Sequence, residues 1–277
     1  MAMRAHIHDV KIEQRKSSWN NASYACKACP AFETVIFCRR ASTGFCATTM
    51  RRTLIPGSFR GKMAVQISRQ MKAHLLCADC EQRFSKLGEN WVLKHCLRKD
   101  GTFPLKSILS ARTPDISAPP NPTKIYLASG ISEINIEALS YFAASIFWRG
   151  SIHPWNDDGS IPVNLGPFQE QFRQYLMGQR AFPKDASLWV VVREGKEIDR
   201  LTYAPIGTRQ GNFHAYKFPM PGLAFSMLVS RNIPANHRER CLVHGPGNPI
   251  IVTTLIDKLL VDEAVKMHQR SQYSIPA

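Results

Sequence analysis

The chain of 277 residues lacks any apolar run long enough to cross a membrane. A transmembrane helix needs about 18 to 20 predominantly apolar residues in succession, and no stretch approaches that length. The first residues, Met-Ala-Met-Arg-Ala-His-Ile-His, also lack the apolar centre of a secretory signal peptide. We therefore expect a cytoplasmic protein without a membrane partner, whose cysteine thiols stay reduced.

Acidic residues are scarce, and several familiar catalytic motifs are missing. The sequence contains no Gly-x-Ser-x-Gly motif, no phosphate-binding glycine-rich loop and no Rossmann fingerprint. Only 21 Asp and Glu accompany 36 Lys and Arg, which gives a formal net charge of +15. Lys and Arg exceed Asp and Glu by 12 in residues 1–120 but by only 3 in residues 121–277. The expected partner of the basic part is a polyanion, DNA or RNA, and the alternative is a solvated basic face without a ligand.

Cysteine is almost confined to the same basic part. Seven of the eight cysteines lie in the first 96 residues, and Cys241 stands alone. In a reducing compartment this clustering favours a metal site over disulfides. Two Cys-x-x-Cys pairs supply the four thiolates of a tetrahedral structural Zn²⁺ site: Cys26, Cys29, Cys77 and Cys80. The 47 residues between the pairs exceed the usual finger spacing, so Cys38 with Cys46 is the alternative first pair. As single residues, Cys38, Cys46 and Cys96 are expected to be small buried side chains.

The second pair has the stronger local context. Leu75 and Leu76 lead into Cys77, and a helix-like run over residues 81–91 follows Cys80, as in a zinc knuckle that opens into a helix. Basic residues gather in the same half of the chain. The candidates for phosphate contacts are Arg39, Arg40, Arg51, Arg52, Arg60, Lys62 and Lys72.

Residues 111–123 hold four prolines, which forbid a continuous helix or a central strand. We place a linker there, between a basic, Cys-rich zinc module at residues 1–110 and an α+β domain of unknown role at residues 124–277. Apolar spacing predicts core helices over residues 134–148 and 166–177. Short β-branched or aromatic segments predict a small antiparallel sheet, and a final helix follows. The strands are predicted at residues 187–193, 200–204, 212–218 and 223–229, and the helix at residues 252–268.

Residues 75–92, Leu-Leu-Cys-Ala-Asp-Cys-Glu-Gln-Arg-Phe-Ser-Lys-Leu-Gly-Glu-Asn-Trp-Val, resemble a block of uncharacterised bacterial proteins related to the HNH endonucleases. Residues 141–149, Tyr-Phe-Ala-Ala-Ser-Ile-Phe-Trp-Arg, and 165–170, Leu-Gly-Pro-Phe-Gln-Glu, resemble further blocks of those proteins. The resemblance covers most of residues 70–180. It implies a treble-clef zinc knuckle carrying a nuclease site, in which a His in a His-Ile-Ile-Pro-like motif activates water and a second metal binds the scissile phosphate.

The sequence departs from that pattern at the catalytic position. The corresponding segment is Thr-Leu-Ile-Pro at residues 53–56, with Thr53 in place of the His. A threonine hydroxyl titrates far above neutral pH and cannot act as the general base. The candidate substitutes are His74 as the base and Glu81 or Glu89 as ligands of a hard cation such as Mg²⁺ or Mn²⁺.

Two histidine segments outside the resemblance are weaker candidates. His153 precedes Pro-Trp-Asn-Asp-Asp, which we interpret as an ordinary turn. His237, Cys241 and His244 form a possible metal trio without a fourth ligand in view.

The sequence thus predicts an HNH-like, zinc-stabilised nucleic-acid-binding protein, with DNA as the expected partner and a degenerate catalytic site. One alternative is an active, metal-dependent DNA endonuclease in a defence or mobile-element setting. The other is a zinc-folded interaction module that binds a protein partner through residues 124–277.

Overall fold

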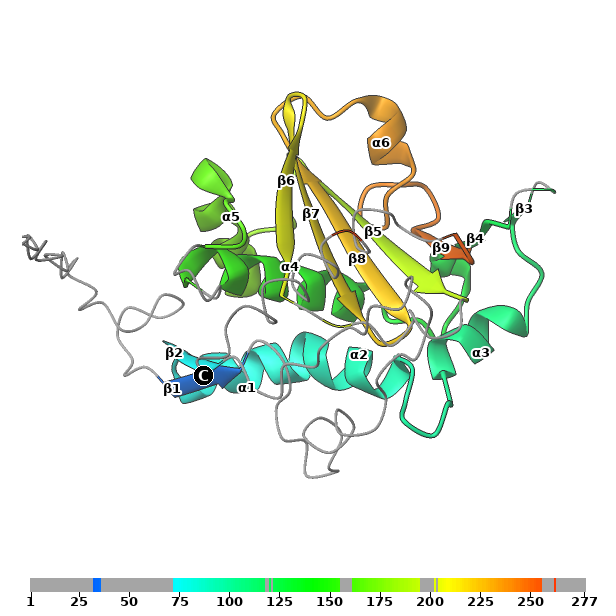
Figure 1. The fold of residues 1–277 in the computed structure, drawn as a ribbon, viewed down its shortest axis with the longest axis horizontal. Coiled ribbons are helices and arrows are strands. Elements are labelled where there is room, and N and C mark those ends of the chain that lie inside the picture. The colour runs from blue at the N-terminus through cyan, green and yellow to red at the C-terminus, as the bar shows by residue number, and fades with distance from the viewer. Residues whose placement is uncertain are drawn as a thin grey trace, which may run out of the picture.

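The computed structural model describes residues 32–35, 72–117, 120, 122–154, 161–194, 202, 204–255 and 262. These residues form a mixed α+β fold, as the sequence predicts. Figure 1 shows three layers: a twisted sheet, a long helix α4 beneath it, and a second helical layer on the far side of α4. No helix among these residues combines the length and apolarity of a membrane span.

The main sheet has seven strands in the order β3-β4-β9-β5-β8-β7-β6. All neighbours are antiparallel except β5 and β9, which run parallel. The bounds are β3 Ile116–Ser117, β4 Lys124–Leu127, β5 Ala186–Arg193, β6 Ile206–Gln210, β7 Phe213–Met220, β8 Leu223–Val229 and β9 Pro249–Thr253. The prediction of a small sheet is therefore wrong, because β3, β4 and β9 extend it beyond the predicted strands.

The sheet buries one face against helix α4 (Ile136–Ile152). Leu188, Val190 and Val192 alternate with half-buried residues along β5, as expected for a strand with period two. From α4, the ring of Phe142 contacts Phe225 at a centroid distance of 5.4 Å. These aromatic and branched side chains form the centre of the core.

Helix α4 starts at a polar cap and is buried all round. The Asn135 side chain accepts the N–H of Ala138 at 2.8 Å, which satisfies one of the unpaired amides of the first turn. Every residue from 138 to 152 is buried. The predicted core helix over residues 134–148 is confirmed, and the second helical layer covers the side of α4 that faces away from the sheet.

That second layer is one continuous helical rod. It consists of α1 Ala78–Phe84, a π-helical segment η2 Ser85–Glu89 and α2 Asn90–His95, and it confirms the helix predicted at residues 81–91. A short ribbon leads into it, formed by β1 Phe32–Val35 and β2 Lys72–Leu76. The remaining helices are α3 Pro104–Ser110, η3 Ala128–Gly130, η4 Gly166–Phe168, α5 Gln169–Leu176 and α6 Ala235–Glu239. Together, η4 and α5 confirm the helix predicted at residues 166–177.

The helical rod and the sheet share one hydrophobic core. Buried residues from Ala73 to Leu109 and from Tyr126 to Val252 belong to a single cluster. At the β7–β8 turn, the N–H of Leu97 donates to the carbonyl of Pro221 at 3.1 Å. Gly222 follows with φ +75°, and a Cβ there would lie 2.6 Å from the Phe103 ring, so the turn packs closely on the segment after α2. Strand β3 falls inside residues 111–123, the predicted linker.

One element prediction needs correction at its bounds, and another falls largely on residues that the structure does not describe. Residues 249–253 form the central strand β9, whereas a helix was expected to start at residue 252; beyond residue 255, only residue 262 is described. The strand expected at residues 200–204 lies largely outside the described residues, and β6 begins at Ile206. For β9, pairing with β4 and β5 decides the bounds, and local pattern does not contain that information.

Candidate metal centre

Cys77 and Cys80 lie where strand β2 turns into helix α1. Cys77 is the extended residue that precedes the helix, with φ −78° and ψ 167°, and its carbonyl accepts the N–H of Glu81 at 2.9 Å. Cys80 follows in the first helical turn, and both side chains are only 3% exposed. Two cysteines spaced as Cys-x-x-Cys thus occupy the turn between a strand and a helix, which we call the knuckle.

The register of the β1–β2 ribbon relates this knuckle to the first cysteine pair. Phe32 pairs with Leu76 and Val35 with Lys72, in antiparallel directions. The chain that precedes Phe32 and the chain that follows Leu76 therefore leave the ribbon at the same end. Cys26 and Cys29 belong to the preceding chain, but they lie outside the described residues. Within the described part of the chain, no three His, Cys, Asp or Glu side chains are placed to hold a metal ion.

The knuckle helix docks on α4 through an aromatic contact. The ring of Phe84, one turn after Cys80, lies 5.7 Å from the Tyr141 ring at 90° and 6.2 Å from the Trp148 ring. The guanidinium carbon of Arg149 lies 5.7 Å from the centre of the same ring, within the range of a cation–π contact. Phe84 thus fixes the start of the helical rod against α4.

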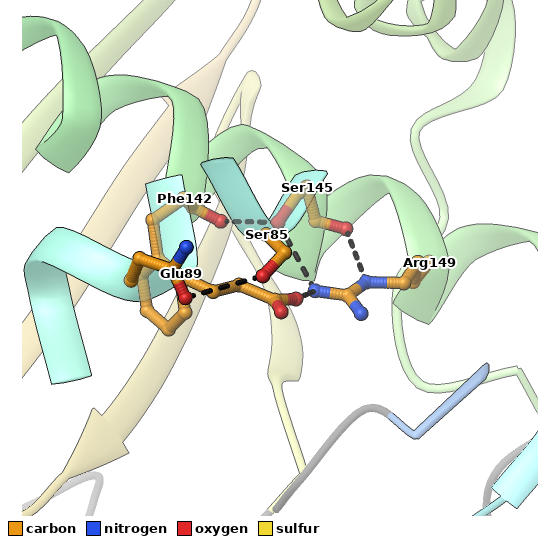
Figure 2. A network of polar contacts seen from close by, with 6 residues as sticks. Ser85, Glu89, Phe142, Ser145 and Arg149 are labelled. Carbon is orange, nitrogen blue, oxygen red and sulfur yellow. Dashed lines mark hydrogen bonds and ion pairs between the residues drawn. The ribbon is translucent and has the colours of Figure 1, made fainter. Parts of the chain in front are cut away.

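A buried polar network lies next to this contact (Figure 2). Arg149 is fully buried, and one of its terminal nitrogens donates to Oε1 of Glu89 at 2.7 Å and to Oγ of Ser145 at 3.1 Å. The hydroxyl of Ser145 in turn donates to the carbonyl of Phe142 at 2.8 Å. A buried charge is costly unless it is paired and hydrogen-bonded, and this network meets that need for Arg149.

The π-helical segment brings Glu89 into position. Its wider turn is a feature often found where a helix meets a special packing demand. Gly88 approaches α4 so closely that a Cβ would lie 2.9 Å from the backbone nitrogen of Phe142. The absent side chain at Gly88 therefore lets the two backbones meet, and the neighbouring carboxylate reaches Arg149.

The hard-cation ligands proposed from sequence do not come together. Glu89 is an ion-pair partner of Arg149, and the positive guanidinium disfavours a cation at the same carboxylate. This ion pair therefore excludes Glu89 as a metal ligand. Glu81 is half-buried and His74 is exposed on β2, opposite Glu33 in the ribbon register. Neither belongs to a metal-holding group among the described residues.

Most of the predicted nucleic-acid and catalytic positions are not placed by the structure. Thr53 lies outside the described residues, as do Cys38 and Cys46. Of the predicted phosphate contacts, only Lys72 falls on a described element, the first residue of β2, and its side chain is not described. The residues outside the described ranges are Arg39, Arg40, Arg51, Arg52, Arg60 and Lys62.

The other cysteines and histidines singled out above make packing or hydrogen-bond contacts where the structure describes them. Cys96 is fully buried, as expected, its thiol donates to the carbonyl of Leu93, and burial raises its pKa to about 11. Cys241 is also buried, and its sulfur accepts the N–H of His244 at 3.3 Å. The His237 ring contacts Trp189 and Phe213, whereas the His244 ring contacts Phe182. His153 is half-buried, and desolvation lowers its pKa.

Sequence reasoning missed the partnership between Glu89 and Arg149. One signal was present: Arg149 ends the apolar run Tyr-Phe-Ala-Ala-Ser-Ile-Phe-Trp at residues 141–148, and a charge on a buried helix needs a partner. The identity of that partner was not readable from the sequence, because Glu89 lies 60 residues earlier in the chain.

Comparisons with protein-family models, curated proteins and solved structures find no match to this chain. The described residues form a mixed α+β protein in which a strand-to-helix turn with Cys77 and Cys80 leads into a helix that packs on α4. The likeness to HNH-related proteins remains a resemblance carried by residues 75–92, 141–149 and 165–170.

Proposed function

We propose that this chain is a zinc-stabilised nucleic-acid-binding protein that resembles the HNH endonucleases and lacks their nuclease activity. The observation that carries the proposal is the register of the β1–β2 ribbon. It directs the chain next to each Cys-x-x-Cys pair to the same end of the ribbon. This is the connectivity that a four-cysteine treble-clef site requires.

Chain length supports the same assignment. Cys29 is three residues before Phe32, so their Cα atoms are at most about 11 Å apart, and Cys77 directly follows Leu76. Phe32 and Leu76 are paired across the ribbon. These short connections support one ion shared by the two pairs, whereas Cys38 and Cys46 follow β1 in the sequence, on the side of Val35. We thus favour Cys26, Cys29, Cys77 and Cys80 as the ligands.

The role of the metal is to fold the module, and the role of the module is to present positive charge. A structural zinc site contributes its binding free energy to folding. The excess of 12 positive charges in residues 1–120 then attracts a polyanion through phosphate contacts and counterion release. DNA is the partner we propose, and Arg39, Arg40, Arg51, Arg52, Arg60, Lys62 and Lys72 are the proposed contacts.

The proposed lack of nuclease activity rests on Thr53. Hydrolysis in HNH-related sites depends on an imidazole that takes a proton from water, and threonine cannot replace it at neutral pH. The ion pair of Glu89 with Arg149 also removes one of the candidate ligands for a catalytic cation.

Metal analysis of the full chain tests the zinc assignment. We expect about one zinc per chain, lost in Cys77→Ala and retained in Cys96→Ala, which removes a buried thiol outside both pairs. Binding to labelled duplex DNA is then measured with increasing salt. Zinc-free protein that keeps its fold would refute the metal site, and zinc-loaded protein without salt-sensitive DNA binding would favour the protein-interaction alternative.

A further inference from the structure

The helical rod α1–η2–α2 turns one side to the core and the other to solvent. Phe84, Gly88 and Val92 are buried on the inner side. The outer side and the turn after α2 expose five Lys or Arg, with the acids Asp79 near the start of the rod and Asp100 just after the turn. We name four of them the basic ridge: Arg83, Lys86, Lys94 and Arg98.

The ridge has a net positive charge, and the buried ion pair keeps Glu89 from offsetting it. Between residues 82 and 99 the sequence has one acid, Glu89, and five Lys or Arg. Glu89 faces inward, is 8% exposed and is neutralised by Arg149 (Figure 2). The acid that would otherwise offset this surface is therefore removed from it, and no ridge residue makes a salt bridge with an acid that the structure describes.

The two arginines of the ridge are partly oriented. Arg83 donates from one guanidinium nitrogen to the carbonyl of Met177 at 3.4 Å, and Arg98 donates to the carbonyl of Lys94 at 2.9 Å. A guanidinium carries five N–H donors in a planar fork, so such a contact orients the group while other donors still face solvent. Along a helix, Arg83 and Lys94 are about 16 Å apart. That length runs beside several phosphates of a duplex, which carries one charge per about 1.7 Å of axis.

We propose that the basic ridge is a phosphate-contact surface for duplex DNA, in addition to the contacts proposed in residues 39–72. The inference rests on the proposed function and extends it to a part of the chain that the structure describes. Lys and Arg contacts to phosphate position a protein without reading bases, so the ridge binds without sequence preference.

The composition of the ridge favours nucleic acid over a protein partner. The centre of a protein–protein interface is rich in aromatic and aliphatic side chains and poor in charge. Among the described residues of the rod, the large apolar side chain that is exposed is Leu87, at 47%, and it follows Lys86 in the sequence. A polymer with regularly spaced negative charges therefore suits this surface better than the apolar surface of a protein partner does.

The test compares two triple variants of the full chain, each losing three positive charges. The ridge variant is R83Q/K86Q/K94Q. The control is R209Q/R231Q/R240Q, which changes exposed arginines on β6, after β8 and after α6. Affinity for one labelled duplex is measured by fluorescence anisotropy over a salt series, and circular dichroism verifies that both variants are folded.

If the ridge contacts phosphates, its variant reduces the slope of log affinity against log salt by about 2 to 3, because each lost contact removes about 0.9. The control leaves the slope within about one unit of the parent value. Parent protein that binds DNA while both variants show the same slope would overturn the ridge and leave the proposed function intact. Parent protein that does not bind DNA at low salt would overturn both.

Discussion

The fully buried guanidinium of Arg149 donates a 2.7 Å hydrogen bond to Oε1 of Glu89, which lies 60 residues earlier in the chain. This pair joins the knuckle helix to the core helix α4. It also removes the charge of Glu89 from the surface of the rod. One contact between a π-helical segment and α4 thus affects both packing and surface charge.

Breaking this pair should destabilise the protein strongly. We expect Glu89→Leu to lower the free energy of unfolding by about 3 to 5 kcal/mol, because Arg149 is left as a buried, uncompensated charge. Urea denaturation followed by circular dichroism measures the change. The matched control is Glu133→Leu, which breaks an exposed pair with Arg112 and should leave the urea midpoint unchanged. Equal stability of the two variants would show that the pair contributes nothing to the fold.

The close approach at Gly88 gives a second prediction. Gly88→Ala places a Cβ 2.9 Å from the Phe142 backbone nitrogen, so the rod must move away from α4. We expect a loss of about 1 to 3 kcal/mol, typical of overpacking. Gly130→Ala is the control, since a Cβ at Gly130 meets nothing within 4 Å. Thermal or urea unfolding distinguishes the two, and an unchanged Gly88→Ala midpoint would contradict the packing described here.

The shared core leads to a prediction about fragments. A fragment of residues 122–277 loses the rod and exposes the side of α4 that carries Tyr141, Trp148 and Arg149. We expect it to be insoluble or to lack a cooperative unfolding transition, because a large apolar face becomes exposed. The comparison is a chain that starts at residue 72 and retains the rod. A fragment that unfolds cooperatively would show that residues 124–277 form an independent domain, as the proline-rich linker predicts.

Local periodicity was sufficient to predict helix α4, the η4–α5 helix and strands β5, β7 and β8. Each is defined by its own residues: aromatic and aliphatic spacing for the helices, and alternation for strands such as Ala186–Arg193. Strand β9 was misread because Pro249–Thr253 is a short apolar run whose pattern suits a helix or a strand. Pairing with both β4 and β5 makes this segment a strand.

The candidate site was predictable only in part for the same reason. The Cys-x-x-Cys spacing identified Cys77 and Cys80 at a strand-to-helix turn. The pairing of β1 with β2 and of Glu89 with Arg149 depends on contacts between segments that are distant in sequence. Spacing within one segment contains no information on such contacts.

The last prediction concerns catalysis. Because the resemblance to HNH endonucleases assigns Thr53 to the position of the general base, we expect supercoiled plasmid to remain uncut in the presence of Mg²⁺ or Mn²⁺; loss of a general base removes about 10²- to 10⁴-fold in rate. The full chain, loaded with zinc, is incubated with plasmid, and the products are separated on agarose. His74 is the residue that would reverse this expectation, since it is exposed on β2 three positions before Cys77. Nicking that depends on the added cation and disappears in His74→Ala would make His74 the replacement base and the protein an active endonuclease. Because His74 is exposed, that variant should keep the stability of the parent, which separates a loss of chemistry from a loss of fold.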